Sequence, residues 1–262
     1  EYISPHLKEL VSKGYYYSMK SASLIKDVAS NIYTHQDSRD YAEDTPLYAS
    51  ISNDIVASEL YKFIKEYEPS CIICTMVFAA QAINVLKEKG AIQCPCIGII
   101  TDFTVQNYWE DVPMLEYIVV GSEFLRYPLH RRDIAPERVL PYGIPIDTKF
   151  QTRHDQKEMR TRFGLTPEKK TLLIMSGGMG FGKMDDYLKE IDNCDIDLQY
   201  IVVCGSNQKL HKKVSEMELQ KPHLILGFTH EVDLLMDASD CILTKPGGIT
   251  TSESLGKELP MT

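Results

Sequence analysis

Short apolar runs alternate along this chain with longer amphipathic stretches. The runs are rich in β-branched residues and bounded by turn residues, which is typical of buried strands, while apolar positions spaced by three and four residues indicate helices. The predicted strands cover residues 71–75, 96–101, 117–120, 139–140, 171–175, 199–203, 224–226 and 241–243. The predicted helices cover residues 52–67, 79–89, 123–132, 157–163, 184–191, 208–217 and 231–238.

Strands that alternate with helices predict parallel sheets joined by right-handed crossovers, an α/β fold. The turn-rich stretch Gly143–Asp147 interrupts this alternation before it starts again. We therefore expect two Rossmann-like domains, residues 1–146 and residues 147–262. Ligands of open parallel sheets bind outside the carboxyl ends of the strands, so the glycine-rich turns that follow the predicted strands are the candidate binding segments.

Composition narrows the class of protein. The chain has 262 residues, of which 44% are hydrophobic and 25% charged, as expected for a globular protein large enough for two domains. A net charge of -9 argues against nucleic acid as a partner, and no apolar run approaches the roughly 18–20 residues that span a bilayer. The 7 cysteines fall mostly in or beside apolar runs, which suits reduced thiols in the cytoplasm.

Cysteine and histidine spacing gives no convincing metal site. Cys71 and Cys74 have the spacing of a redox motif, but they flank two isoleucines in a run that is better interpreted as a buried strand. We accordingly predict no bound metal.

A pair of glycines, Gly247 and Gly248, follows the last predicted strand. Glycines let the backbone turn sharply and approach a ligand closely. The hydroxyl residues 250–252 are predicted to cap a helix over residues 252–258, and a helix start binds phosphate groups well. Glu253, one turn inside, could accept hydrogen bonds from two sugar hydroxyls. The alternative is an ordinary strand–turn–helix corner.

The sequence from residue 226 to residue 261 resembles the nucleotide-sugar site of glycosyltransferase family 28, through residues 226–230, 244–253 and 259–261. Within that family it is most similar to monogalactosyldiacylglycerol synthases and bacterial processive diacylglycerol glucosyltransferases. The resemblance runs through most of the chain. It implies a GT-B fold, with two doubly wound Rossmann-like domains facing a cleft. Family members extend beyond both ends, so we expect a fragment with two incomplete domains that catalyses little by itself.

The resemblance also implies a set of donor-site residues. By matching to the family motif, Phe228 would pack beside uracil while the backbone of Thr229 reads its edge, although a core position for Phe228 and a helix-capping role for Thr229 are open alternatives. Backbone N–H groups of residues 248–250 would hold the diphosphate, and Glu253 would hold the ribose. The full predicted set is Gly177, Gly178, Gly205, Asn207, Phe228, Thr229, Gly247, Gly248, Ile249, Thr250 and Glu253.

On the acceptor side, Asp102 matches a family Thr-Asp motif and could orient or deprotonate a hydroxyl group, or merely cap the next turn. Trp109 matches a family tryptophan beside the acceptor. The chain departs from the family pattern in two places. Gln106 and Asn107 occupy a stretch where relatives usually carry a histidine. Asp147 stands where a basic residue often lies near the leaving diphosphate, and Lys149 is the nearby basic residue here.

The implied reaction is inverting transfer of a hexose from UDP-glucose or UDP-galactose to diacylglycerol or a glycosyl-diacylglycerol, with no cofactor besides the donor. Four lysines lie on either side of three consecutive tyrosines near the start of the chain: Lys8, Lys13, Lys20 and Lys26 around Tyr15, Tyr16 and Tyr17. This mixture suits an anionic membrane surface or, equally, a solvated helix face. We therefore expect a protein peripheral to the inner face of the cell membrane. The alternatives are transfer to another lipid-linked acceptor of the peptidoglycan-precursor type, a UDP-sugar epimerase, and a non-enzymatic nucleotide-sugar binder.

Overall fold

The computed structural model describes residues 57–58, 60–106, 108–175 and 184–262. The chain divides into two compact units, residues 1–71 with 81–94 and residues 72–80 with 95–262. In the first unit, residues 60–67 are helical before Pro69, and the larger part of helix α4 (Val77–Glu88) follows. Gly90 lies two residues beyond the end of this helix with φ 66°, a left-handed conformation that glycine adopts at little cost.

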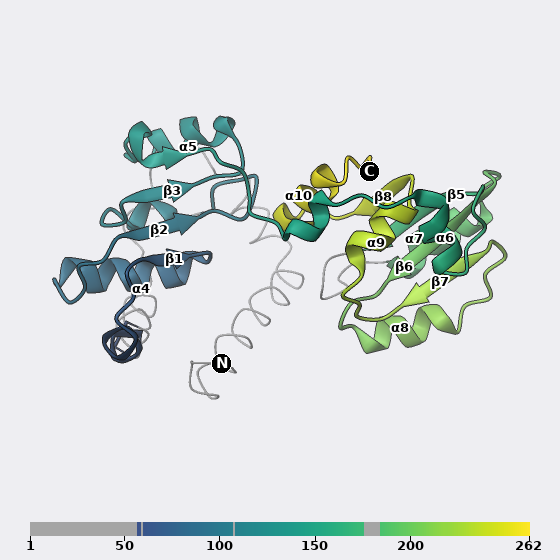
Figure 1. Ribbon diagram of the computed structural model, residues 1–262, viewed down its shortest axis with the longest axis horizontal. Helices are drawn as coiled ribbons and strands as arrows, with labels where there is room; N and C mark the ends of the chain where they lie inside the picture. Colours follow the sequence, from purple (N-terminus) through teal and green to yellow (C-terminus); the bar gives the residue numbers. More distant parts are fainter. Residues whose placement is uncertain (1–56, 59, 107, 176–183) are drawn as a thin grey trace. The chain divides into compact units, whose positions relative to one another are not determined.

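The second unit contains two parallel sheets. The first has the order β1-β2-β3-β4, so its strands are neighbours in sequence and in space (Figure 1). Its strands are β1 (Ile72–Cys74), β2 (Cys96–Ile99), β3 (Tyr117–Val119) and β4 (Val139–Leu140). The interpretation of residues 71–75 as a strand is confirmed, and burial raises the pKa of the Cys74 thiol to about 11.

Short helices connect the strands of the first sheet. They are η2 (Trp109–Asp111), η3 (Glu123–Leu125), α5 (Arg126–His130) and η4 (Pro136–Arg138). The helix predicted over residues 123–132 is therefore shorter and begins as a 3-10 turn. It ends early because the chain turns at Asp133, whose φ of 61° is left-handed.

The second sheet has the order β7-β6-β5-β8, which places the first strand of this half between strands that come later in the chain. Its strands are β5 (Lys170–Met175), β6 (Leu198–Val203), β7 (His223–Leu226) and β8 (Cys241–Thr244). The accompanying helices are η5 (Thr148–Gln151), α6 (Gln156–Arg162), α7 (Met184–Asn193), α8 (Gln208–Ser215), α9 (Val232–Ala238) and α10 (Gly248–Gly256). The domain boundary predicted after residue 146 falls between the two sheets and stays a prediction.

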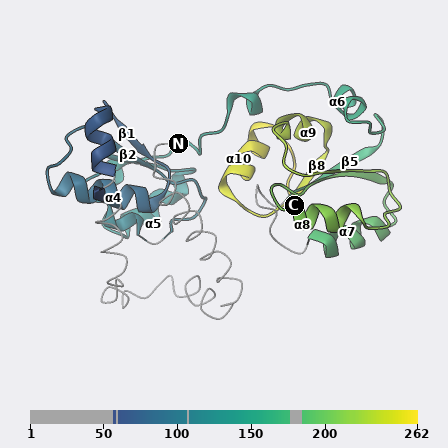
Figure 2. The same cartoon turned by 90° about the horizontal axis from the view of Figure 1, so that it is seen from below.

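Hydrophobic side chains of the strands in the second sheet point alternately to its two faces, and each face has its own hydrophobic core. Leu173 of β5 belongs to the core that includes Leu235 of α9, whereas its neighbour Ile174 belongs to the core that includes Leu188 of α7 and Leu210 of α8. Successive side chains of a strand point to opposite faces, so this division means that helices cover both. Figure 2 shows α6 and α9 on one side of the sheet and α7 and α8 on the other. This sheet is doubly wound, as predicted.

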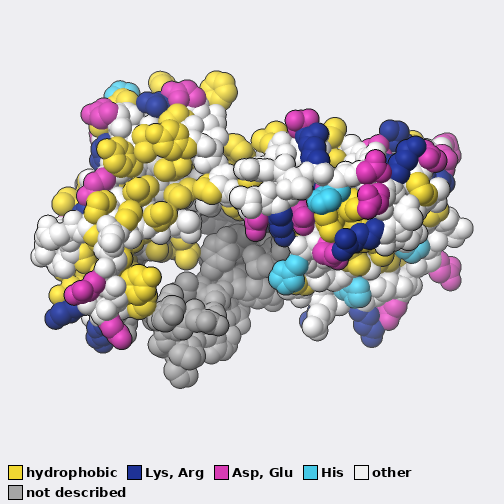
Figure 3. Space-filling view, viewed as in Figure 1, with side chains coloured by type: hydrophobic (Ala, Val, Ile, Leu, Met, Phe, Trp, Pro, Cys, Tyr) yellow, Lys and Arg dark blue, Asp and Glu magenta, His cyan; other side chains and the backbone are white. Residues whose placement is uncertain are grey.

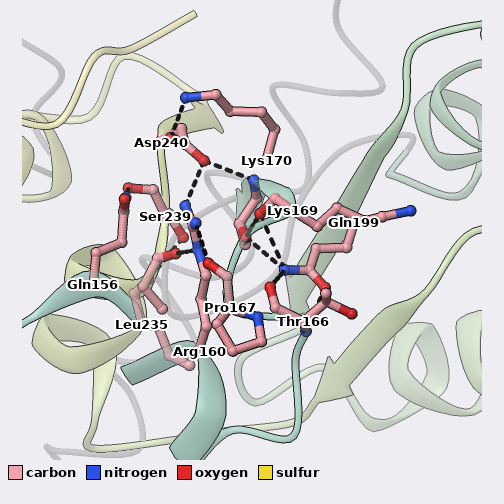
Figure 4. Close-up of polar contacts among 12 residues, drawn as sticks. Gln156, Arg160, Thr166, Pro167, Lys169, Lys170, Gln199, Leu235, Ser239 and Asp240 are labelled. Carbon is pink, nitrogen blue, oxygen red and sulfur yellow. Dashed lines mark hydrogen bonds and ion pairs between the residues drawn. The ribbon is translucent and has the colours of Figure 1, made fainter. Parts of the chain in front are cut away.

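A buried arginine fastens the amino-terminal edge of the second sheet (Figure 4). The guanidinium of Arg160 donates to the Ala238 carbonyl at 2.9 Å and to the Pro167 carbonyl at 2.8 Å. It also pairs with Asp240 at 2.6 Å, and the Arg160 side chain is only 5% exposed. Asp240 in turn accepts the backbone N–H of Thr171 at 2.8 Å. The buried guanidinium and Asp240 thus link helix α6, the loop before β5, strand β5 itself and the segment between α9 and β8.

Candidate functional site

Three of the predicted binding turns leave the same edge of the second sheet. The final residues of the strands are paired in register, Val203 of β6 with Leu226 of β7 and Met175 of β5 with both Val203 and Thr244 of β8. Segments 205–207, 227–229 and 247–250 follow these strand ends. The structure thus brings them to one edge, where ligands of parallel sheets bind. Gly177 and Gly178, after β5, lie outside the described residues.

The glycine turn opens directly into α10. Gly247 is the N-cap residue with extended backbone, φ -86° and ψ 139°, and no side chain caps this helix end. The first backbone N–H groups of a helix have no intrahelical acceptor, so those of Gly248, Ile249 and Thr250 can bind an anion. The predicted helix start at residue 252 was wrong: the hydroxyl of Ser252 donates back to the Gly248 carbonyl at 2.8 Å instead of capping. Glycine, unlike serine or threonine, gives no side-chain signal of a cap.

Glu253 lies in the second turn of α10 and is partly buried. Burial raises the pKa of its carboxyl to about 7. Lys149 opposes the rise, whereas Asp147 and Asp233 add to it. The raised pKa means that its surroundings leave the carboxylate short of hydrogen-bond donors and positive charge. Hydroxyl groups of a bound sugar ring would supply such donors.

The turn after β7 presents an aromatic side chain to solvent. Phe228 is 64% exposed and meets the ring of His230 edge-on, with ring centroids 4.9 Å apart. A core position for Phe228 is thereby excluded. The hydroxyl of Thr229 accepts the backbone N–H of Glu231 at 3.1 Å, a local turn bond, and Glu231 rather than Thr229 is the N-cap of α9. An exposed ring beside a turn with polar backbone groups fits a flat heterocycle.

The turn after β6 combines a left-handed glycine with a helix cap. Gly205 has φ 59°, and the side-chain oxygen of Asn207 accepts the backbone N–H of Leu210 at 3.0 Å to cap α8. This bond accounts for asparagine at the position. Contact between either residue and a nucleotide stays a prediction.

The predicted acceptor residues follow β2 in the first sheet. Oδ2 of Asp102 accepts a hydrogen bond from the Gln106 side chain at 2.6 Å, which fixes the carboxylate. Trp109 is 3% exposed, and its ring packs so closely on Gly98 that a Cβ there would come within 2.6 Å of it. The structure therefore gives Trp109 a packing role, and its contact with an acceptor stays a prediction. Asn107 lies outside the described residues.

A separate cavity of about 290 Å³ opens at the opposite, amino-terminal edge of the second sheet. It contains a polar cluster in which Asp237 bonds both His154, at 2.8 Å, and the buried Lys257, at 2.6 Å. None of the predicted site residues lines it. Because ligands of parallel sheets bind outside the carboxyl ends of the strands, nucleotide binding at the glycine turns and not in this cavity stays the prediction.

Sequence analysis missed the surroundings of Glu253. Asp233 of α9 is 8% exposed, and the ammonium of Lys149 lies 3.6 Å from its Oδ1. The sequence already pointed to Lys149 as a basic residue near Asp147, but not to its contacts; the Asp147 side chain accepts the backbone N–H of Lys149 at 3.1 Å and so starts η5. An Asp two residues before a Lys is a local capping pattern.

The described ranges contain neither a metal-ligand cluster nor a membrane-spanning helix. Among residues 57–58, 60–106, 108–175 and 184–262, no three His, Cys, Asp or Glu side chains are grouped as metal ligands would be. Within the same ranges, no helix has the length and apolar character needed to cross a bilayer.

Solved structures share this arrangement of parallel sheets. UDP-GlcNAc 2-epimerase from Neisseria meningitidis, bound to UDP-GlcNAc, matches with a TM-score of 0.59 at 15% identity, covering 84% of this chain and 66% of that one. Anabaena HepE in complex with UDP matches with a TM-score of 0.55 at 12% identity, covering 79% and 62%. At such identities the likeness concerns the fold. The predicted class, an α/β fold of the GT-B type with Rossmann-like sheets, is confirmed.

Sequence comparison then gives the family. Residues 1–146 match the family described as monogalactosyldiacylglycerol (MGDG) synthase, and the chain belongs to it. A processive diacylglycerol beta-glucosyltransferase of Bacillus pumilus is 29% identical over 248 residues, which are 94% of this chain and 63% of that protein. The enzyme of the same name from Bacillus licheniformis is 30% identical over 204 residues, 77% of this chain and 52% of that protein. The chain therefore spans between about half and two thirds of these relatives.

Proposed function

We propose that this protein is an inverting glycosyltransferase that moves a hexose from UDP-glucose or UDP-galactose to diacylglycerol or a glycosyl-diacylglycerol. The reaction uses no cofactor besides the donor substrate. The proposal rests on family membership, on relatives named diacylglycerol glucosyltransferases, and on structural neighbours solved with UDP or UDP-GlcNAc.

The observation that carries the donor half of the proposal is the start of α10. A helix end without a side-chain cap follows Gly247, and a partly buried carboxylate, Glu253, lies in the same helix. A diphosphate is the anion that fits several exposed N–H groups, and the attached ribose offers two hydroxyls to a carboxylate. The exposed Phe228 follows β7 at the same carboxyl edge of the sheet, separated from β8 by β6 and β5, and supplies a ring for the base.

In the proposed reaction, the carboxylate of Asp102 takes the proton of the acceptor hydroxyl while that oxygen forms a bond to the anomeric carbon of the sugar. The bond between this carbon and the diphosphate oxygen breaks with its electron pair, and UDP departs. The hydrogen bond from Gln106 orients the carboxylate. Backbone N–H groups of residues 248–250 stabilise the negative charge that grows on the diphosphate, which is the usual large electrostatic contribution to such transfers.

A lipid acceptor requires contact with a membrane surface. In Figure 3 hydrophobic side chains gather over the part of the molecule that carries β1–β4. The most exposed of these are Phe124 at 89%, Tyr142 at 78% and Tyr127 at 69%. Aromatic rings of this kind insert at the headgroup level, so we propose a peripheral position on the inner face of the cell membrane.

A transfer assay tests the function. The full-length protein is incubated with UDP-glucose or UDP-galactose labelled in the sugar and with vesicles that contain diacylglycerol; the same mixtures without acceptor are the control. We expect label to enter the organic phase with one of the two donors, and only when diacylglycerol is present.

Two other results would contradict the proposal in distinct ways. A labelled product that forms without an acceptor, either a free sugar or an epimerised sugar, would indicate an epimerase; the UDP-GlcNAc 2-epimerase of Neisseria meningitidis has a similar fold. Label that enters only a polyprenyl-linked acceptor would indicate a peptidoglycan-precursor type of transferase.

A further inference from the structure

Lys149 joins the segment before the second sheet to the donor-site turn that follows β7. Its ammonium donates to the backbone carbonyl of His230 at 2.8 Å, across 81 positions of sequence. It also lies 3.6 Å from Oδ1 of Asp233, at the start of α9. The His230 carbonyl belongs to the turn that carries Phe228, so a single side chain fixes the position of this turn relative to η5.

The same ammonium faces an excess of negative charge. Lys149 lies in η5, which packs against α10, the helix that carries Glu253. Burial raises the pKa of Glu253, Lys149 lowers it, and the carboxylates of Asp147 and Asp233 raise it further. If all three carboxylates are ionised, a single positive charge compensates three negative ones. The Lys149 side chain is 37% exposed, so solvent screens part of this attraction.

We propose that Lys149 is a positioning residue of the donor site: it holds the base-binding turn in place and favours the ionised form of Glu253, which accepts hydrogen bonds from ribose. This inference rests on the proposed function.

The affinity for the donor is therefore expected to depend on pH. The pKa of Glu253 is about 7 in the free protein, and ribose hydroxyls donate to the ionised form. Donor affinity should therefore rise with pH through about 7 and then level off. Loss of the Lys149 charge would raise the pKa further and move this rise to higher pH.

The test is a calorimetric titration with UDP-glucose between pH 6 and pH 8.5, since its diphosphate has no group that titrates in this range. Lys149→Met removes both the charge and the donor, Lys149→Gln keeps a donor without the charge, and Lys149→Arg keeps both. Lys157→Met is the matched control, because Lys157 forms an exposed ion pair with Glu168. Melting temperature is recorded for every variant.

At pH 7 we expect the Met variant to bind roughly three- to tenfold more weakly than wild type, the range of one lost hydrogen bond. We expect the Gln variant to show its loss mainly at or below pH 7, and the Arg and control variants to resemble wild type. An unchanged pH profile in the Met and Gln variants, or an equal loss at every pH, would overturn the inference while leaving the proposed function intact. If wild type binds neither UDP-glucose nor, in a repeat titration, UDP-galactose, both the inference and the proposed function are contradicted.

Discussion

Replacement of Glu253 by alanine is expected to weaken UDP binding about 10- to 100-fold at pH 8, the cost of losing hydrogen bonds to a charged group. The carboxylate is ionised at this pH because its raised pKa is about 7. Isothermal titration of the full-length protein measures the change. Glu216→Ala is the matched control, since Glu216 lies at the exposed C-terminal end of α8 in a weak pair with Lys212. Equal affinity of wild type and Glu253→Ala would place the ribose elsewhere.

The same variant should not be less stable, which separates binding from folding. The folded-state pKa of Glu253 is raised from 4.5 to about 7, so the folded protein holds a proton that the unfolded chain releases between these values. This contribution to stability is complete below pH 4.5 and is lost as the pH rises through about 7. Relative to wild type, the melting temperature of Glu253→Ala should therefore increase between pH 5 and pH 8. A relative decrease would show that the carboxylate stabilises the fold.

Replacement of Arg160 by methionine is expected to lower the free energy of unfolding by about 3 kcal/mol, near the lower end for removing one partner of a buried ion pair. The lower end applies because Asp240 is 24% exposed and keeps its bonds from Lys170 and Thr171. Two carbonyls would lose their donors as well. Urea denaturation followed by circular dichroism measures the change.

The control for this prediction lies on the same helix. Arg162 pairs with Glu231, but the two side chains are 52% and 46% exposed, so Arg162→Met should cost at most about 1 kcal/mol. Similar losses for the two variants would mean that the Arg160 network does not stabilise the edge of the sheet.

Asp240 makes the free energy of unfolding depend on pH. Burial alone would raise the pKa of its carboxyl, but the Thr171 N–H, Lys170 and Arg160 lower it. Stability from Asp240 is thus present above its ordinary pKa and lost as the pH falls through the lowered value.

Sequence alone predicted the fold well because buried parallel strands leave a strong trace. The run that forms β8, Cys-Ile-Leu-Thr, is apolar, short and bounded by turn residues, and no helix of that length would be stable. The ends of helices were predicted less accurately where two residues of one segment could each start the helix. Serine and threonine after Gly248 suggested a helix cap, yet the glycine itself begins the helix four residues earlier.

The sequence predicted the backbone turns of the candidate site, but not the contacts between its charged side chains. Glycine turns after strands are local patterns, so segments 205–207, 227–229 and 247–250 could be found from the sequence and are brought to one edge by the sheet order. The bond from Lys149 to His230 joins positions 81 residues apart, and nothing in the local pattern of either segment specifies it. Burial of Glu253 among other carboxylates likewise depends on the packing of α9 and η5 against α10.

Hydrogen–deuterium exchange with and without UDP tests most directly that the carboxyl edge of the second sheet holds the nucleotide. The N–H groups at the start of α10 have no capping side chain and should exchange quickly in the free protein. We predict that UDP slows exchange in peptides covering residues 246–253 and 227–231, and leaves the cavity lined by His154 and Lys257 unchanged. Protection confined to that cavity, or none at saturating UDP, would contradict the assignment.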